Sequence, residues 1–315
     1  MIMVALYIAL ALLGCVIVFY VIPNVFVAVA LYNILLVRTK KTKWARGCSW
    51  DDEEQQCMFD SGKEWGAKNE EYHSTLTVKS GKFRLVGEYF DFGNDKAVIM
   101  VPGRMETCEY SYYFAEPYKK SGYNVLAIDN RSHGLSDGKF DDLGLKEYKD
   151  LLAWAKKLHD EYGIKKIWFH GMCIGAATCL YACTAEDAPD YIQGMTNEGM
   201  FIHFGDMLEK RIAERNHKVH PCLDIVIGII TVVSGRNPVK HGPVNYIEKM
   251  NKPMLFMYSK KDVYSDPEKI NGMYEKCPAV KQIKWFNEGI HSHIRINQTE
   301  EYDKTIEDFL AENAQ

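Results

Sequence analysis

The first 36 residues contain no Asp, Glu, Lys or Arg, although 25% of the whole chain is charged. The net charge of -4 leaves no basic excess, which excludes the phosphate-neutralising surface typical of nucleic-acid-binding proteins. The nine cysteines form no recognisable disulfide framework, and the chain has neither an internal repeat nor a low-complexity tract. With 47% hydrophobic residues, the remainder has the composition of an ordinary globular protein.

The uncharged segment predicts a membrane anchor over residues 1–36. Ile2–Val21 is an apolar run that, at ~1.5 Å per residue, would span a bilayer core of ~30 Å. After Pro23, Val25–Leu36 continues either as the end of a tilted or kinked helix or as an interfacial segment. The alternative is a secretory signal peptide cleaved after Ala30. The length of the run and the lack of a positive charge before it favour the anchor.

A basic collar without any acidic residue follows the anchor and comprises Arg38, Lys40, Lys41, Lys43 and Arg46. Basic residues beside a membrane span tend to remain in the cytoplasm, and none precedes this span. We therefore expect a single-pass protein of the cell membrane with its globular part in the cytoplasm, and a collar that attracts anionic lipid headgroups. Residues 47–70 are polar and without clear periodicity, so residues 37–70 are interpreted as collar and linker.

From residue 71 to 315, apolar segments of strand type alternate with helical patterns. The first two strands look antiparallel, and the alternation after them predicts a mostly parallel sheet with helices on both faces. The helical patterns include Leu145–Tyr162, which Gly163 ends, and a last helix that Thr299 caps. The expected strands are Ser74–Val78, Phe83–Asp91, Ala97–Val101, Asn124–Ile128, Lys166–His170, Tyr191–Thr196, Met254–Tyr258 and Gln282–Phe286.

Residues 199–250 interrupt this alternation and predict a helical cap inserted between two strands. Within it, Phe204–His217 has an amphipathic helical pattern, and Leu223–Val233 is apolar but too short to span a membrane. Two interpretations remain open. The cap either packs on the main domain alone, or it is a lid that gives the site an apolar wall or touches the bilayer.

A nucleophile elbow is predicted where the strand Lys166–His170 runs into Gly171, Met172, Cys173, Ile174 and Gly175. Flanking glycines allow a strained turn that lifts the middle side chain out of the sheet, and the following helix directs its positive end at that side chain. The nucleophile position, where serine is usual, holds Cys173. A thiol at a helix N-terminus beside a histidine is activated as a nucleophile.

This elbow and three further motifs resemble the α/β-hydrolase superfamily over residues 72–312. The similarity is strongest to bacterial membrane-anchored hydrolases related to serine aminopeptidases and to monoacylglycerol-lipase-like esterases. It implies the α/β-hydrolase fold, with a mostly parallel eight-stranded sheet, helices on both faces and a cap insertion, behind an N-terminal transmembrane helix. The other motifs are the oxyanion loop Val101–Arg104, the turn Asp129–Ser136, and the pair Ser259–Asp262 and Gly289–His291.

Position by position, the resemblance implies that Cys173 is the nucleophile, His291 the general base and Asp262 the acid that orients the imidazole. His293 lies two residues beyond His291, but the offset from the final helix in the family favours His291. The resemblance implies neither a metal ion nor an organic cofactor.

The oxyanion hole is implied at the backbone N–H groups of Ile174 and Arg104, with Met105 as the alternative to Arg104. Pro102 stands where the family has a histidine that braces the loop, which leaves the preorganisation of this turn open. His133, in the Asp-x-Arg-x-His-Gly turn, is expected to hold that turn together and not to act on the substrate.

These features predict a membrane-anchored α/β hydrolase that acts on an acyl ester, thioester or amide through a covalent acyl-enzyme on Cys173. Thioesters react readily with amines and thiols, so an acyltransferase is an alternative, and a catalytically inactive binding or scaffolding protein that retains the fold is another. The expected partners are a small acyl substrate, lipophilic because of the apolar cap and the tether, and the lipid bilayer. No nucleic-acid partner is expected.

Overall fold

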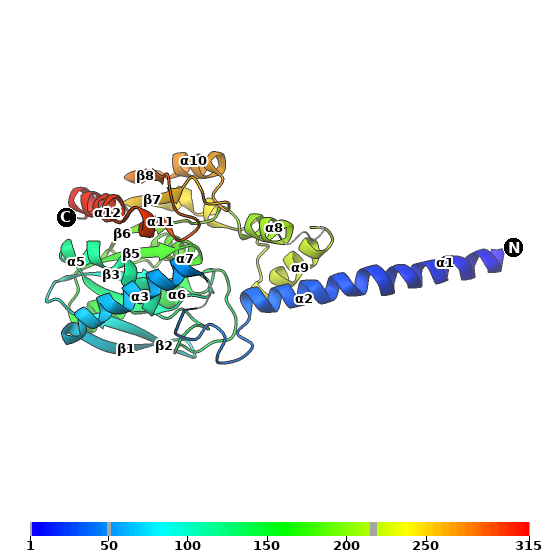
Figure 1. Cartoon of the computed structure of the whole chain (residues 1–315), viewed down its shortest axis with the longest axis horizontal. Coiled ribbons are helices and arrows are strands. Elements are labelled where there is room, and N and C mark those ends of the chain that lie inside the picture. Colours follow the sequence, from blue (N-terminus) through cyan, green and yellow to red (C-terminus); the bar gives the residue numbers. More distant parts are fainter. Residues whose placement is uncertain (1, 49–51, 215–218, 315) are drawn as a thin grey trace.

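The computed structural model describes residues 2–48, 52–214 and 219–314. An eight-stranded sheet with helices on both faces forms the body, and a long N-terminal helix projects from it (Figure 1). The strand order is β1-β2-β4-β3-β5-β6-β7-β8. All of the predicted strands are present, as β1 His73–Ser80, β2 Phe83–Phe90, β3 Lys96–Val101, β4 Asn124–Ile128, β5 Lys166–Met172, β6 Ile192–Glu198, β7 Met254–Ser259 and β8 Lys281–Phe286.

The sheet is antiparallel only where β2 pairs with β1 and with β4. Every other neighbouring pair is parallel, as the alternation of strands and helices predicts. Parallel strands end at the same edge of a sheet, so the loops that follow β3, β5, β6, β7 and β8 meet there. This edge is where the predicted catalytic residues come together.

The pleat of the strands divides the core into two hydrophobic clusters. In β5, Ile167 and Phe169 belong to the cluster beneath α6 and α7, whereas Trp168 and Met172 belong to the cluster on the opposite face. The first face carries α6 Tyr148–Tyr162, α7 Ile174–Cys183 and α10 Pro267–Lys276, and the second carries α4 Cys108–Ser111, α5 Glu116–Lys120, α11 Ile294–Asn297 and α12 Thr299–Asn313.

The predicted anchor is one continuous helix of 35 residues, long and apolar enough to cross a membrane. It comprises α1 Ile2–Val16, the π-helical turn η1 Ile17–Val21 and α2 Ile22–Leu36. Pro23 lacks an N–H group, and its ring would crowd the carbonyl of Phe19 in a regular helix. The wider π turn immediately before it accommodates the ring. The proline therefore changes the helix locally and does not end it.

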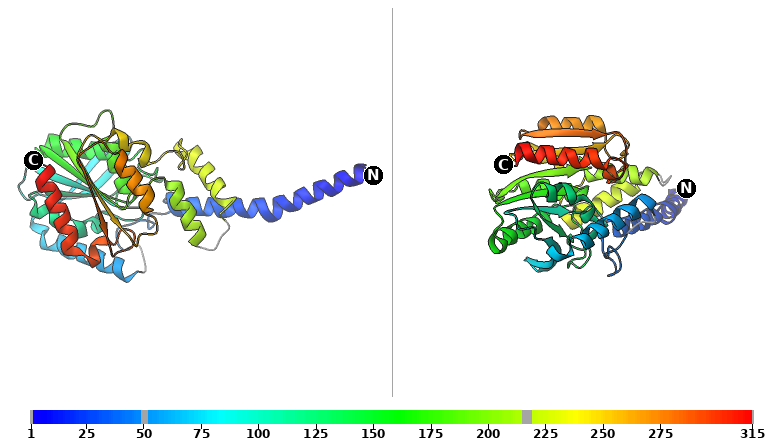
Figure 2. Two further views of the ribbon diagram at one scale, coloured as in Figure 1. Left: turned by 90° about the horizontal axis from the view of Figure 1, so that it is seen from above. Right: turned by 60° about the vertical axis from the view of Figure 1, so that its left-hand side comes forward.

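The last part of α2 is packed into the protein, unlike α1, which has no buried residue. The cap consists of α8 Phe204–Glu214 and α9 Cys222–Ser234, and α9 packs along α2 (Figures 1 and 2). The predicted amphipathic pattern extends to His217, but residues 215–218 lie outside the described residues. The buried residues of α2 are Ala28, Tyr32, Leu35 and Leu36.

The prediction of an irregular linker is wrong for Glu53–Lys68, which form the helix α3. The side chain of Asp52 caps this helix by accepting a hydrogen bond from the backbone N–H of Gln55 at 2.8 Å. One face of α3, including Met58 and Phe59, is buried against the second core cluster. The helix is polar overall because only this narrow face contacts the domain, which is why its composition resembles that of a linker.

Most of the basic collar also contacts the domain. Arg46 pairs with Glu88 at 2.6 Å and with Asp129 at 2.9 Å. Arg38 donates to the Gly134 carbonyl at 2.8 Å, and Lys43 donates to the carbonyls of Asn33 and Val37 near the end of α2, each at 2.5 Å. Among the five basic residues only Lys40 and Lys41 are exposed, and the expectation that the collar attracts lipid headgroups stays a prediction.

The last helix begins at Thr299 but is not capped by it. The Thr299 hydroxyl donates to the Arg295 carbonyl at 2.9 Å, so it is directed away from the free N–H groups of the first turn. Gln298 occupies the N-cap position, but its side chain makes no capping hydrogen bond and donates to the Glu288 carbonyl at 2.8 Å instead. The predicted cap is therefore wrong, whereas the predicted end of α6 at Gly163, with φ 68°, is confirmed.

Candidate active site

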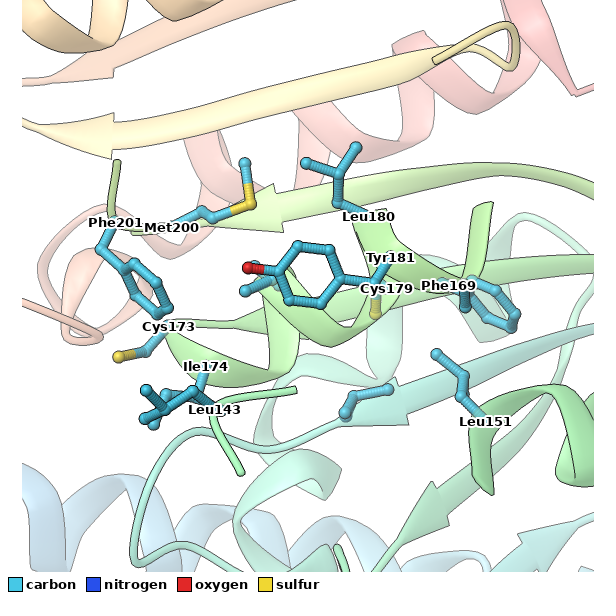
Figure 3. Packing of buried hydrophobic residues seen from close by; sticks show 14 of the residues in the cluster. Leu143, Leu151, Phe169, Cys173, Ile174, Cys179, Leu180, Tyr181, Met200 and Phe201 are labelled. Carbon is cyan, nitrogen blue, oxygen red and sulfur yellow. The ribbon is translucent and has the colours of Figure 1, made fainter. Parts of the chain in front are cut away.

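Cys173 occupies the turn between β5 and α7 with φ 52° and ψ -113°, a backbone conformation that is rare for residues other than glycine. Its N–H donates to the Glu198 carbonyl at 2.9 Å. The glycines on either side are required by close approach. A Cβ atom on Gly171 would lie 2.5 Å from the Ala176 Cα, and one on Gly175 would lie 2.1 Å from the Val101 carbonyl oxygen. The turn holds Cys173 at the N-terminus of α7 (Figure 3).

His291 and Asp262 lie beside this turn, in the loops that follow β8 and β7. His291 Nδ1 and Asp262 Oδ2 are 2.7 Å apart, and Ser265 donates to the same carboxylate oxygen at 2.6 Å. The Tyr264 N–H donates to the other oxygen at 2.8 Å. Burial raises the pKa of Asp262, but the charge of His291 and these hydrogen bonds outweigh it, so the pKa is lowered.

The other ring nitrogen of His291, Nε2, is buried and has no hydrogen-bond partner within residues 2–48, 52–214 and 219–314. Burial favours the neutral imidazole, but the charges of Asp262 and Cys173 outweigh burial and raise the pKa of His291 well above its ordinary value. Both His291 and Cys173 line the same cavity. Asp262 thus holds one ring nitrogen of His291, and Cys173 lies close enough to raise the pKa of the same ring.

His293 makes a different contact. Its Nδ1 lies 3.0 Å from Glu54 Oε2 near the start of α3, and its side chain also borders the cavity. The structure thus brings His291, and not His293, to Asp262.

The loop after β3 is braced without the histidine that Pro102 replaces. The Gly103 N–H donates to Glu106 Oε2 at 2.8 Å, and Asn130 Nδ2 donates to the Pro102 carbonyl at 2.9 Å. The Met105 N–H, the alternative donor for the oxyanion hole, donates to His133 Nε2 at 3.2 Å. This N–H is therefore already used within the protein. The N–H groups of Arg104 and Ile174 donate to no protein acceptor within the described ranges.

His133 is held in one tautomer. Its Nδ1 lies 3.0 Å from the Arg131 carbonyl and therefore carries the proton, which leaves Nε2 as the acceptor for Met105. Burial lowers the pKa of His133 to about 4, so the ring is neutral at physiological pH. Trp44 stacks on the ring with centroids 4.6 Å apart and planes 8° apart. The predicted structural role of this turn residue agrees with these contacts, and Trp44 extends the support to the basic collar.

The active-site cavity has a volume of about 390 Å³. Sequence reasoning missed most of its wall, which combines the end of α2, the start of α3, the cap helix α8 and the loop after β7. The end of α2 and the start of α3 carry no motif, Tyr264 lies two residues beyond the Ser259–Asp262 motif, and only the apolar pattern of the cap suggested an apolar wall. The lining residues are Leu35, Asp52, Gln55, Gly103, Arg104, Glu106, Cys173, Phe204, Met207, Leu208, Arg211, Tyr264, Ile290, His291, Ser292 and His293.

A second buried carboxylate lies behind the elbow. Tyr302 OH donates to Glu198 Oε2 at 2.5 Å, and Glu198 Oε1 is buried with no hydrogen-bond partner in the described part of the chain. Burial raises the pKa of Glu198 to about 7. Gly199, the next residue, allows His291 to approach, because a Cβ atom there would lie 3.2 Å from His291 Cε1.

Comparison with known proteins agrees with this architecture. Residues 96–215 match the family described as alpha/beta hydrolase fold. An esterase from Pyrococcus furiosus superposes with a TM-score of 0.65 at 23% identity, covering 77% of this chain and 92% of that one. The chain has the α/β-hydrolase fold.

Two further relatives extend the comparison. An α/β hydrolase from Vibrio vulnificus superposes on this fold with a TM-score of 0.60 at 20% identity, covering 90% of this chain and 92% of that one. The uncharacterized protein YqkD of Bacillus subtilis (strain 168) is 31% identical over 196 residues, or 60% of this chain. The match spans 62% of the length of that curated relative. These similarities concern the α/β-hydrolase fold, so the activity is argued from the site.

Proposed function

We propose that this protein is a membrane-anchored hydrolase of acyl esters, thioesters or amides, with Cys173 as nucleophile, His291 as general base and Asp262 as the orienting acid. One observation carries the proposal. His291, held by Asp262 at 2.7 Å, lines the same cavity as a cysteine in a strained turn at a helix N-terminus. Pyrococcus and Exiguobacterium esterases that share the fold support a hydrolase.

The chemistry follows from these positions. Cys173 transfers its proton to His291 Nε2, which the raised pKa of His291 favours, and the thiolate Sγ then attacks the acyl carbonyl. The negative charge that develops on the carbonyl oxygen is stabilised by the N–H groups of Arg104 and Ile174. The bond to the leaving group breaks as His291 returns the proton to that group. Water then attacks the thioester, gives its proton to His291, and releases the carboxylic acid as Cys173 regains a proton.

The anchor and the cavity together favour a lipophilic acyl substrate and a cell-membrane location with the catalytic domain in the cytoplasm. Leu35 of α2 and Phe204, Met207 and Leu208 of α8 give the cavity an apolar wall. The same α2 helix continues the apolar segment that would cross the bilayer. A substrate dissolved in the membrane would thus have a short path to Cys173.

Labelling with a thiol-directed acyl probe tests the proposed nucleophile. We expect rapid labelling of the wild type, loss of this labelling in Cys173→Ala and strong slowing in His291→Ala. Cys57→Ala is the matched control, because Cys57 is an exposed thiol that does not line the cavity. Equal labelling of wild type, Cys173→Ala and His291→Ala would contradict the proposal and favour a non-catalytic binding protein.

Membrane fractionation tests the anchor separately. We expect the full chain to stay in the membrane fraction after carbonate extraction, because an apolar helix of 35 residues is not released by disrupting surface contacts. A soluble mature chain that begins at Leu31 would contradict the anchor and favour a cleaved signal peptide.

A further inference from the structure

The side chain of Arg104 lines the cavity beside Cys173 but has no partner of its own. Its Nη1 atom is fully buried without a hydrogen bond, and its guanidinium group donates to no acceptor among the described residues. No described carboxylate lies within ion-pair distance of it, and Asp141 and Cys173 influence it only as nearby charges. Burial lowers the pKa of Arg104, but an arginine remains a cation at neutral pH.

A buried cation without a partner is costly, so native proteins pair such groups with an anion. The carboxylates that share the cavity are already engaged. Glu106 accepts from the Gly103 N–H and Asp52 accepts from the Gln55 N–H, whereas Asp262 lies outside the cavity lining and faces His291. The Arg104 guanidinium can therefore still donate hydrogen bonds to an anion in the space that the substrate would occupy.

Arg211 adds a second positive charge to the same cavity from the cap. It lies on α8, donates to Tyr264 OH at 2.9 Å, and its charge lowers the pKa of Arg104 after the larger effect of burial. Its Nη1 atom also lies 3.9 Å from Glu214 Oε2 on the same helix. Two arginines from separate elements, the loop after β3 and the cap, thus face one cavity.

We propose that Arg104, with Arg211 in support, forms an anion subsite that selects acyl substrates carrying a carboxylate or phosphate group. This inference rests on the proposed function for the identity of the reacting group. The anion would accept charge-assisted hydrogen bonds from the Arg104 guanidinium, while the apolar wall formed by Leu35 and α8 would hold the hydrocarbon part. The preferred substrate is accordingly an amphiphile with one anionic group close to the scissile bond.

Matched ester pairs test this preference in the full-length protein. On the acyl side, 4-nitrophenyl glutarate is compared with 4-nitrophenyl valerate, and on the leaving-group side a monoacylglycerol phosphate is compared with the monoacylglycerol. We expect the wild type to favour the anionic member of one pair by about 10- to 100-fold in kcat/KM. The pair that shows the preference identifies which side of the scissile bond carries the anion.

Arg104→Gln should remove this preference, mainly through a higher KM for the anionic ester, and Arg104→Lys should restore part of it. Arg236→Gln, which removes an exposed arginine at the end of the cap, is the control and should keep the ratio. Equal kcat/KM for the anionic and neutral esters in the wild type would overturn the subsite. Equal loss of activity on both esters in Arg104→Gln would also overturn it. That result would indicate that Arg104 stabilises the Cys173 thiolate or the loop after β3 instead.

Binding separates this inference from the proposed function. Calorimetry on Cys173→Ala, run with both pairs, should show tighter binding of the anionic member than of the neutral member in at least one pair, and the additional Arg104→Gln change should abolish the difference. If the wild type turns over none of the esters while this binding difference is present, the hydrolase proposal fails and the anion subsite stands. Absence of the binding difference, with turnover intact, contradicts the subsite alone.

Discussion

The two walls of the active-site cavity are built in different ways. The wall that carries Cys173, Asp262 and His291 consists of short loops at the ends of neighbouring parallel strands. The opposite wall is assembled from the end of α2, the start of α3 and the cap helix α8. The first wall positions reacting groups through backbone geometry within one sheet. The second brings together segments that are distant in sequence, from Leu35 of α2 to Arg211 of α8, and it determines what fits beside the reacting groups.

This difference leads to separable effects of substitution. Changes in the strand-end wall should lower kcat for every acyl chain, because they alter the groups that make and break bonds. Changes in the opposite wall should alter KM and chain-length preference, because they alter the surface that holds the acyl chain.

The largest effect is expected for His291→Ala, which removes the proposed base. The kcat for ester hydrolysis should fall by about 10³-fold or more for short and long acyl chains alike. His293→Ala is the matched comparison, because His293 also borders the cavity but faces Glu54. Steady-state kinetics on a chain-length series measure both. If His293→Ala loses as much kcat as His291→Ala, the assignment of the base is wrong.

A smaller effect is expected for His133→Ala, which removes the acceptor for the Met105 N–H and the stacking partner of Trp44. The loop that presents the Arg104 N–H should become less ordered, and kcat should fall by about 10- to 100-fold with little change in KM. His133→Gln, whose amide oxygen can accept the same hydrogen bond, should recover part of the rate. A change confined to KM would place this turn with the substrate wall.

Leu35→Ala tests the opposite wall. It should destabilise the fold by about 2 to 5 kcal/mol, because Leu35 is buried, and raise KM about tenfold for the acyl chains that contact it. The kcat for the shortest chain should be nearly preserved. Ile34→Ala, on the exposed side of the same helix, should do neither. Equal loss of kcat for all chain lengths would remove the distinction between the walls.

The smallest effect concerns the pH dependence of stability. A histidine whose pKa is raised on folding stabilises the native state most below its unfolded pKa of about 6.5, and this contribution is lost as the pH rises through the folded value. The melting temperature of the wild type should therefore exceed that of His291→Ala by about 2 to 4 °C more at pH 5.5 than at high pH. A difference independent of pH would contradict the His291–Asp262 ion pair.

The strand-end wall could be predicted from the sequence because its signals are local. The glycines around Cys173 reflect contacts within one turn, and Asp262 and His291 directly follow apolar strands. Bracing of the oxyanion loop could not be predicted, since it joins Met105 to His133 and Trp44 through distant pairs. The contact between His293 and Glu54 could not be predicted either, because the two residues lie far apart in the sequence and belong to no shared motif.

The opposite wall escaped prediction for a related reason. The helix α3 has few apolar residues and so resembles a linker, although Asp52 followed by Glu53 and Glu54 is a helix start signal. Leu35 is one of many apolar residues in the N-terminal helix. Its burial in the folded protein, which the sequence does not indicate, distinguishes it from the exposed apolar residues of the same helix. The sequence likewise does not show the acceptors of three collar residues. These residues are Arg38, Lys43 and Arg46, which contact Gly134, Val37 and Asp129.

Capture of the covalent intermediate tests the central claim most directly. The protein is mixed with an activated acyl ester, quenched in acid during turnover, and analysed by intact mass and peptide mapping. The account predicts a mass increase equal to one acyl group on the peptide that contains Cys173, cleavable by neutral hydroxylamine as a thioester and absent from Cys173→Ala. Turnover without any acyl group on Cys173, or with the acyl group on another residue, would contradict it.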